Sequence, residues 1–168
     1  LGGRRIIKTL GLVALQTTSA ICFVAAGNTF NDVSDVNIDA VAKPHRPIPS
    51  ERISASDANK VGYAFTFLSA LFMAAGVAFT QDIYPLIGIW TFAALLMYTY
   101  DAGPQTKRLG LIGNVAISLM VGAVIIFGAA AVSLFDTPIV FFAAGVAFFA
   151  NLAREIIKDC EDMESDEG

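Results

Sequence analysis

The sequence predicts an all-α fold, a polytopic bundle of transmembrane helices with about five spans in these 168 residues. The composition is 55% hydrophobic and only 15% charged, with a mean hydropathy of +0.63, which is far more apolar than a soluble domain. The apolar residues form long blocks, and a block of about twenty residues crosses the ~30 Å hydrocarbon layer as a helix. No alternating pattern of a membrane barrel appears. We therefore expect a multi-pass protein of the cell membrane.

Five candidate spans follow one another along the chain. They lie at residues 6–27, 61–79, 83–100, 109–135 and 138–157. Ser54, with Asp57 three residues later, indicates a helix start before the second span. Pro85 lies in the first turn of the third span, and Pro138 opens the fifth. Small residues recur within the spans and allow close helix packing in lipid, so a packed bundle is expected.

The distribution of Lys and Arg predicts the orientation, because short cytoplasmic loops carry the excess of these residues. The segments after the first and third spans and the end of the fifth hold eight of them: Lys43, Arg46, Arg52, Lys60, Lys107, Arg108, Arg154 and Lys158. The turns after the second and fourth spans hold none. Two acidic segments, 31–39 and 159–167, are therefore expected on the cytoplasmic face. Arg4, Arg5 and Lys8 disagree, because they would lie outside.

Several other classes of protein are disfavoured. The net charge is −4 and no basic footprint for nucleic acid is present. Cys22 and Cys160 have neither disulfide nor metal-ligand spacing, and His45 is the only histidine, so a histidine metal site or a Ser-His-Asp triad is improbable. Because the chain begins with Leu1, has no recognisable signal peptide and stops just after its second acidic segment, we expect a fragment of a larger membrane protein.

The two acidic segments are candidate metal sites. Residues four apart share a helix face, and this spacing recurs in both segments: Asn31, Asp35 and Asp39 in the first, Asp162 and Asp166 in the second. Mg²⁺ takes one or two carboxylates together with phosphate oxygens and water, so two such clusters would clamp a diphosphate. Solvated loop acids are the alternative for either cluster alone, but two groups of repelling carboxylates beside a membrane favour a cation. The spacing of an EF-hand calcium loop is absent.

Three motifs resemble those of the UbiA prenyltransferase family. Asn31-Asp32-x-x-Asp35-x-x-x-Asp39, followed by Lys43-Pro44-His45-Arg46-Pro47-Ile48-Pro49-Ser50, resembles the first signature of that family. Asp162-x-x-x-Asp166, in the context Arg154-Glu155-Ile156-Ile157-Lys158-Asp159, resembles the second, and Lys107-Arg108-x-Gly110-x-x-Gly113-Asn114 is similar to the loop after the fourth helix. Family members have nine transmembrane helices. The resemblance implies that residues 1–168 form a partial domain, helices two to six, without the first helix and the last three.

The resemblance implies Mg²⁺-dependent transfer of a polyprenyl group from its diphosphate to an acceptor in the membrane. The implied metal ligands and supporting groups are Asn31, Asp32, Asp35, Asp39, Asp159, Asp162 and Asp166, of which Asp35, Asp39, Asp162 and Asp166 are central to catalysis. The implied diphosphate contacts are Lys43, Arg46 and Lys107, although these bases could serve orientation alone. Tyr98 and Tyr100 are candidates for the wall around an allylic cation or for acceptor binding, although interfacial tyrosines are common without a catalytic role.

The acceptor is predicted from finer similarities. The segments 47–54 and 154–162 most resemble the archaeal geranylgeranylglycerol-phosphate geranylgeranyltransferases, which implies geranylgeranylglyceryl phosphate as the acceptor in ether-lipid synthesis. Relatives with aromatic acceptors of the quinone, tocopherol or chlorophyll type use the same metal apparatus and stay open as an alternative. The stretch 100–106 is longer than expected, which leaves the alignment of the tyrosines and Lys107 open. The isolated polypeptide is expected to be inactive.

An ion-coupled transporter is the alternative from a different class. It predicts polar groups along the middle of several spans. The second, fourth and fifth spans hold few of them: Thr66, Ser69, Asn114, Ser118, Ser133 and Asn151. The sequence gives no indication of the oligomeric state or of a general base.

Overall fold

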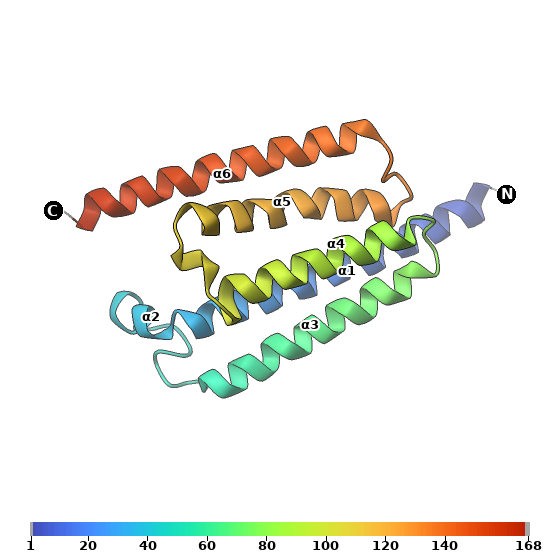
Figure 1. The fold of residues 1–168 in the computed structure, drawn as a ribbon. Coiled ribbons are helices and arrows are strands. Elements are labelled where there is room, and N and C mark those ends of the chain that lie inside the picture. Colours follow the sequence, from blue (N-terminus) through green and yellow to red (C-terminus); the bar gives the residue numbers. More distant parts are fainter. Residues whose placement is uncertain (1, 167–168) are drawn as a thin grey trace. The chain divides into compact units, whose positions relative to one another are not determined.

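The computed structural model describes the backbone of residues 2–166 and the side chains of residues 6–161. Within this range every regular element is a helix, and five helices are long and apolar enough to cross a membrane (Figure 1). These five spans confirm the all-α fold class and the order of spans expected from the sequence. The chain divides into two compact units, Leu1–Phe79 and Thr80–Gly168.

The first unit contains α1 (Gly2–Ser34), α2 (Val36–Ala42) and α3 (Ala55–Val77), and α1 packs against α3 along its length (Figure 1). Polar side chains of α1 bond to the backbone of α3. Ser19 Oγ donates to the Ser69 carbonyl at 2.8 Å, and Gln16 Nε2 donates to the Met73 carbonyl at 3.2 Å. Since lipid competes poorly for such donors, small residues and interhelical hydrogen bonds hold membrane helices together.

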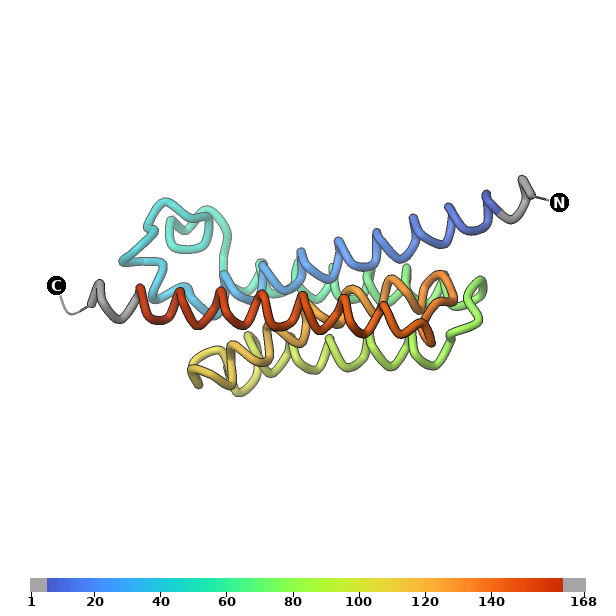
Figure 2. The backbone as a smooth tube through the Cα atoms, turned by 90° about the horizontal axis from the view of Figure 1, so that it is seen from above, coloured from blue at the N-terminus to red at the C-terminus, as the bar shows by residue number. Residues whose placement is uncertain are grey.

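The helix α1 continues beyond the apolar span that the sequence predicted at 6–27 and ends at Ser34. Its break at Asp35 is short, because the backbone N–H groups of Asp35 and Asp39 bond to carbonyls four residues earlier, at 3.0 and 2.8 Å. The loop 43–54 then coils beside the end of α1 and leads into α3 (Figure 2). Ser54 Oγ accepts the backbone N–H of Asp57 at 3.0 Å, which confirms the predicted helix start.

The second unit contains α4 (Ile83–Met97), a π-helical turn η1 (Tyr98–Ala102), a 3₁₀ turn η2 (Thr106–Arg108), α5 (Leu111–Ala131) and α6 (Pro138–Asp166). Contacts of α5 with both α4 and α6 make this unit a three-helix layer (Figure 1). The fourth span, α5, is shorter than the predicted 109–135. Residues with positive φ lie just outside its two ends, Gly110 at 54° and Ser133 at 60°, and such backbone angles do not continue a right-handed helix. The long stretch 100–106 is accommodated by η1 and the turn after it.

Hydrogen bonds tie the turn before α4 to the turn between α5 and α6. Thr80 Oγ1 donates to the Ala130 carbonyl at 2.7 Å, and the Gln81 N–H donates to Ser133 Oγ at 2.9 Å. The Phe135 N–H donates to the Asp82 carboxylate at 3.0 Å. One end of the second unit is thereby fastened by side-chain bonds between two turns that are about fifty residues apart in sequence.

Candidate functional site

The first acidic motif begins in the last turn of α1 and ends in α2. The backbone N–H of Asp35 bonds to the carbonyl of Asn31, and the N–H of Asp39 bonds to the carbonyl of Asp35. These bonds keep the helical spacing across the short break, so the three residues share one face of the backbone. Asp39 is buried, with 4% of its surface exposed, whereas Asn31 and Asp35 are half-buried. The carbonyl of Asp39 also accepts the N–H of Lys43 at 2.7 Å, which ends α2.

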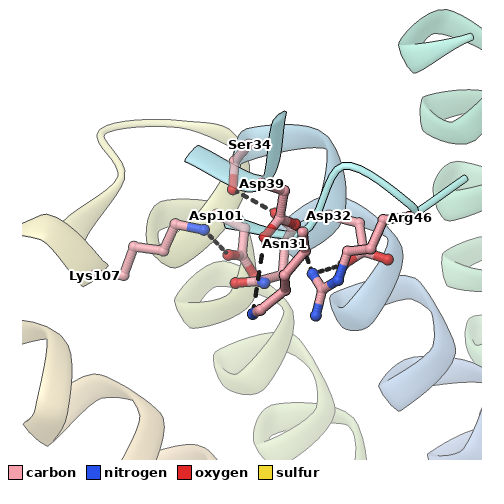
Figure 3. A network of polar contacts seen from close by, with 8 residues as sticks. Asn31, Asp32, Ser34, Asp39, Arg46, Asp101 and Lys107 are labelled. Carbon is pink, nitrogen blue, oxygen red and sulfur yellow. Dashed lines mark hydrogen bonds and ion pairs between the residues drawn. The ribbon is translucent and has the colours of Figure 1, made fainter. Parts of the chain in front are cut away.

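Arg46 connects the motif with the loop that follows it (Figure 3). Its Nη1 atom donates to Asp32 Oδ1 at 3.0 Å and to Asp39 Oδ2 at 2.6 Å. Lys43 Nζ lies 3.8 Å from the other oxygen of Asp39. The structure therefore brings together four residues that the sequence predicted as ligands or diphosphate contacts, and two cations already compensate the buried carboxylate of Asp39.

The loop that carries Arg46 is held by hydrogen bonds to its own backbone carbonyls. The N–H of Ser50 bonds to the Arg46 carbonyl at 3.0 Å, and the side chain of Arg52 donates to the His45 carbonyl at 2.8 Å. The two arginines of this loop thus differ in their contacts. Arg46 faces the acidic motif, whereas Arg52 bonds to the loop itself and to the hydroxyl of Ser50.

In the second unit, Lys107 is held by a residue to which sequence reasoning assigned no role. Lys107 Nζ lies 3.1 Å from Asp101 Oδ1, and the two side chains are only 10% and 6% exposed (Figure 3). Asp101 is part of the π-helical turn η1, a rare conformation that is frequent at functional sites. The unusual length of the stretch 100–106 was the one available signal. Of the two tyrosines in this turn, Tyr98 is 54% exposed and Tyr100 is half-buried.

The second acidic motif lies at the C-terminal end of α6. Asp159 Oδ2 accepts a hydrogen bond from Asn114 Nδ2 at 2.7 Å, so a residue in the first turn of α5 holds the first carboxylate of this motif. Asn114 is the last residue of the motif 107–114, but no role was predicted for its side chain from the sequence. The side chains of Asp162 and Asp166 lie outside the described residues.

The donor chemistry of the described residues fits Mg²⁺. The motifs offer carboxylate and amide oxygens, which are hard ligands, and Mg²⁺ is usually bound through one or two carboxylates and substrate phosphate. Among residues 6–161, no three His, Cys, Asp or Glu side chains come together as a metal cage. A single carboxylate of such a motif can serve as a Mg²⁺ ligand, because phosphate oxygens and water complete the coordination.

Comparisons with known proteins identify the family. The model of the UbiA prenyltransferase family matches residues 3–168. Digeranylgeranylglyceryl phosphate synthase of Methanococcus aeolicus is 32% identical over 94% of this chain and 52% of its own length. The synthase of the same name from Methanopyrus kandleri is 38% identical over 92% of this chain and 53% of its own. The chain thus spans about half the length of these curated relatives.

A solved structure, from work on digeranylgeranylglyceryl phosphate synthase in membranes, has the same fold. It superposes with a TM-score of 0.66 and 27% identity, covering 98% of this chain and 66% of that one. The acidic motifs, the bases beside them and the five spans therefore occur in a chain that is similar throughout to one group of membrane proteins. On this evidence the chain belongs to the UbiA prenyltransferase family.

Proposed function

We propose that the protein carrying this chain transfers a geranylgeranyl group from its diphosphate to geranylgeranylglyceryl phosphate, a step of archaeal ether-lipid synthesis. The observation that carries this proposal is the clustering of Asp32, Asp39, Lys43 and Arg46 at the end of a membrane span. The names of the relatives support the choice of acceptor. The five spans are proposed to correspond to helices two to six of the family.

Two proposed roles follow for the first motif. Asn31, Asp32, Asp35 and Asp39 would hold Mg²⁺, and the bound ion would neutralise charge on the diphosphate. In the described structure Arg46 and Lys43 pair with Asp39. When the substrate binds, Lys43 and Arg46 would leave the carboxylate of Asp39 and pair with phosphate oxygens instead. Mg²⁺ would then take their place beside the carboxylates, so no negative charge is left unpaired. Because charge accumulates on the leaving diphosphate, cations that contact it lower the barrier.

In the second unit, Lys107 is the proposed diphosphate contact, and Asp159, Asp162 and Asp166 are the proposed ligands of the second motif. Asp101 would keep the Lys107 ammonium group in place while the substrate is absent. The bond between C1 of the geranylgeranyl group and the diphosphate oxygen breaks with its electron pair leaving on the diphosphate. The acceptor hydroxyl oxygen then forms the new bond to C1, and its proton passes to the released diphosphate.

Other residues of this region are proposed to exclude water. An allylic cation requires an apolar, π-rich wall, because water would capture it. Tyr98 and Tyr100 are the proposed wall or acceptor-binding residues. Both acidic motifs are proposed to face the cytoplasm, since the basic residues of the chain gather in the same segments.

The test is transfer of radiolabelled geranylgeranyl diphosphate by the full-length protein in membranes, with geranylgeranylglyceryl phosphate and an aromatic acceptor offered separately. Transfer to the glyceryl phosphate should require Mg²⁺ and fall about 100-fold or more in Asp35→Ala and in Asp162→Ala. Asp57→Ala is the control, because Asp57 is an exposed acid outside both motifs. Transfer only to the aromatic acceptor would overturn the choice of acceptor. Transfer that survives both substitutions would overturn the metal site.

A further inference from the structure

We propose that Asn114 is a positioning residue that fixes the carboxylate of Asp159 from the neighbouring helix. Its Nδ2 atom donates to Asp159 Oδ2 at 2.7 Å across 45 positions of sequence. A hydrogen bond of an amide to an ionised carboxylate is short and roughly twice as strong as a neutral one. The inference rests on the proposed function, because it gives Asn114 a task only if the second acidic motif binds a cation.

The donor is itself held rigidly. Asn114 is buried, with 9% of its surface exposed, in the first turn of α5. Its backbone N–H bonds to the Gly110 carbonyl at 3.1 Å, and its carbonyl accepts the Ser118 hydroxyl at 2.6 Å. The hydroxyl of Ser118 in turn accepts a bond from Asn151 Nδ2 at 3.1 Å. The backbone of Asn114 is therefore fixed within its own helix by Gly110 and Ser118, whereas the bond of Asn151 to Ser118 joins α5 to α6 without contacting the Asn114 side chain.

The backbone around Asn114 leaves little freedom to shift. A Cβ on the preceding residue, Gly113, would lie 2.8 Å from Lys107 Cα and 2.9 Å from the Thr106 carbonyl oxygen. The start of α5 is thus packed directly against η2, which carries the proposed diphosphate contact Lys107. As a result, the same short segment carries the donor to the acidic motif, Asn114, and the proposed diphosphate contact, Lys107.

The chemical consequence concerns the lone pairs of Asp159. The bond to Asn114 engages one carboxylate oxygen and orients the other, so that the group is presented in one geometry. Carboxylates that bind metal ions are usually oriented by such neighbouring donors, and loss of a donor costs about 10- to 100-fold in metal affinity or activity. A donor that merely joined two helices would not affect cation binding in this way.

The chain offers a matched control for the test. Asn114→Ala removes the bond to Asp159, and Asn151→Ala removes the bond to Ser118 in the same helix interface, about two turns away from the motif. Both variants of the full-length protein would be purified in detergent. Their Mn²⁺ affinity in the presence of inorganic diphosphate would be measured by electron paramagnetic resonance, and their thermal stability alongside it.

We expect Asn114→Ala to raise the Mn²⁺ dissociation constant about 10- to 100-fold, and Asn151→Ala to change it by less than about 2-fold. The exchange variant Asn114→Asp with Asp159→Asn can restore the hydrogen bond with donor and acceptor reversed. It should recover thermal stability but not Mn²⁺ affinity.

Two results would overturn the inference. Wild-type Mn²⁺ affinity in Asn114→Ala, or equal weakening by Asn151→Ala, would contradict a positioning role while the proposed function stands. Wild-type protein that binds no Mn²⁺ with diphosphate would overturn the proposed function and the positioning role together.

Discussion

The contact between Gly76 of α3 and Gln16 of α1 gives a prediction whose magnitude follows from the coordinates. A Cβ at position 76 would lie 1.6 Å from Gln16 Nε2, whereas ordinary contacts are 3.4 Å or longer. The amide must therefore move by roughly 2 Å, so it loses its 3.2 Å bond to the Met73 carbonyl. A buried polar group without a partner costs about 1–3 kcal/mol, and alanine in place of glycine in a helix returns about 1 kcal/mol.

Gly76→Ala should thus destabilise the first unit by up to about 2 kcal/mol, a change of about 30-fold in the ratio of folded to unfolded protein. The measurement is SDS unfolding in mixed micelles followed by circular dichroism. Gly11→Ala is the control, because no atom lies within 4 Å of its new Cβ. In a Gln16→Ala background the cost of Gly76→Ala should disappear. Equal stability of Gly76→Ala and Gly11→Ala, or an undiminished cost without the glutamine, would refute the reasoning.

Three further predictions concern the site. Arg46→Ala should lower kcat/KM about 100-fold and Arg52→Ala only a few-fold, because only the first arginine faces the acidic motif; equal losses in a transfer assay would contradict this. Asp101→Asn should lower the free energy of unfolding by about 3 kcal/mol in the same assay, because it leaves the ammonium group of Lys107 without its partner on a side chain that is 90% buried. Adding Lys107→Met should recover part of this loss, and a loss below about 1 kcal/mol in Asp101→Asn would contradict a buried ion pair. The exposed thiol of Cys160 should react with a membrane-impermeant maleimide in inverted vesicles and not in intact cells, with Cys160→Ser as the control; the reverse pattern would invert the proposed orientation.

Much of the fold could be predicted, because a run of about twenty apolar residues in the sequence indicates a membrane span. The predicted starts at Ile83 and Pro138 coincide with those of α4 and α6, where Pro85 and Pro138 mark the first turn. The ends were less predictable. The helix α1 continues to Ser34 through polar residues, since a helix does not stop where the hydrocarbon layer does. The span 109–135 was too long, because Ser133 adopts a left-handed conformation that a hydropathy pattern does not register.

The candidate site was predictable where its residues are close in sequence. The clustering of Asp32, Asp39 and Arg46 follows from helical spacing and a short loop. The bond between Asn114 and Asp159 could not be derived, because helix periodicity relates residues a few positions apart and these are 45 apart. Asp101 was missed for another reason. Its turn is π-helical, so the spacing that usually relates a carboxylate to a lysine on one face does not apply.

The bonded turns at one end of the second unit have a mechanical consequence. Thr80, Asp82 and Ser133 fasten the turn before α4 to the turn between α5 and α6. Lys107, in η2 between α4 and α5, and Asp159, near the C-terminal end of α6, belong to the other end of the unit. The opposite end is fastened as well, by the bond between Asn114 and Asp159 and by the ion pair of Lys107 with Asp101. Because polar contacts hold both ends of the unit, α4, α5 and α6 are expected to move as one body, and the charged groups keep their spacing within it.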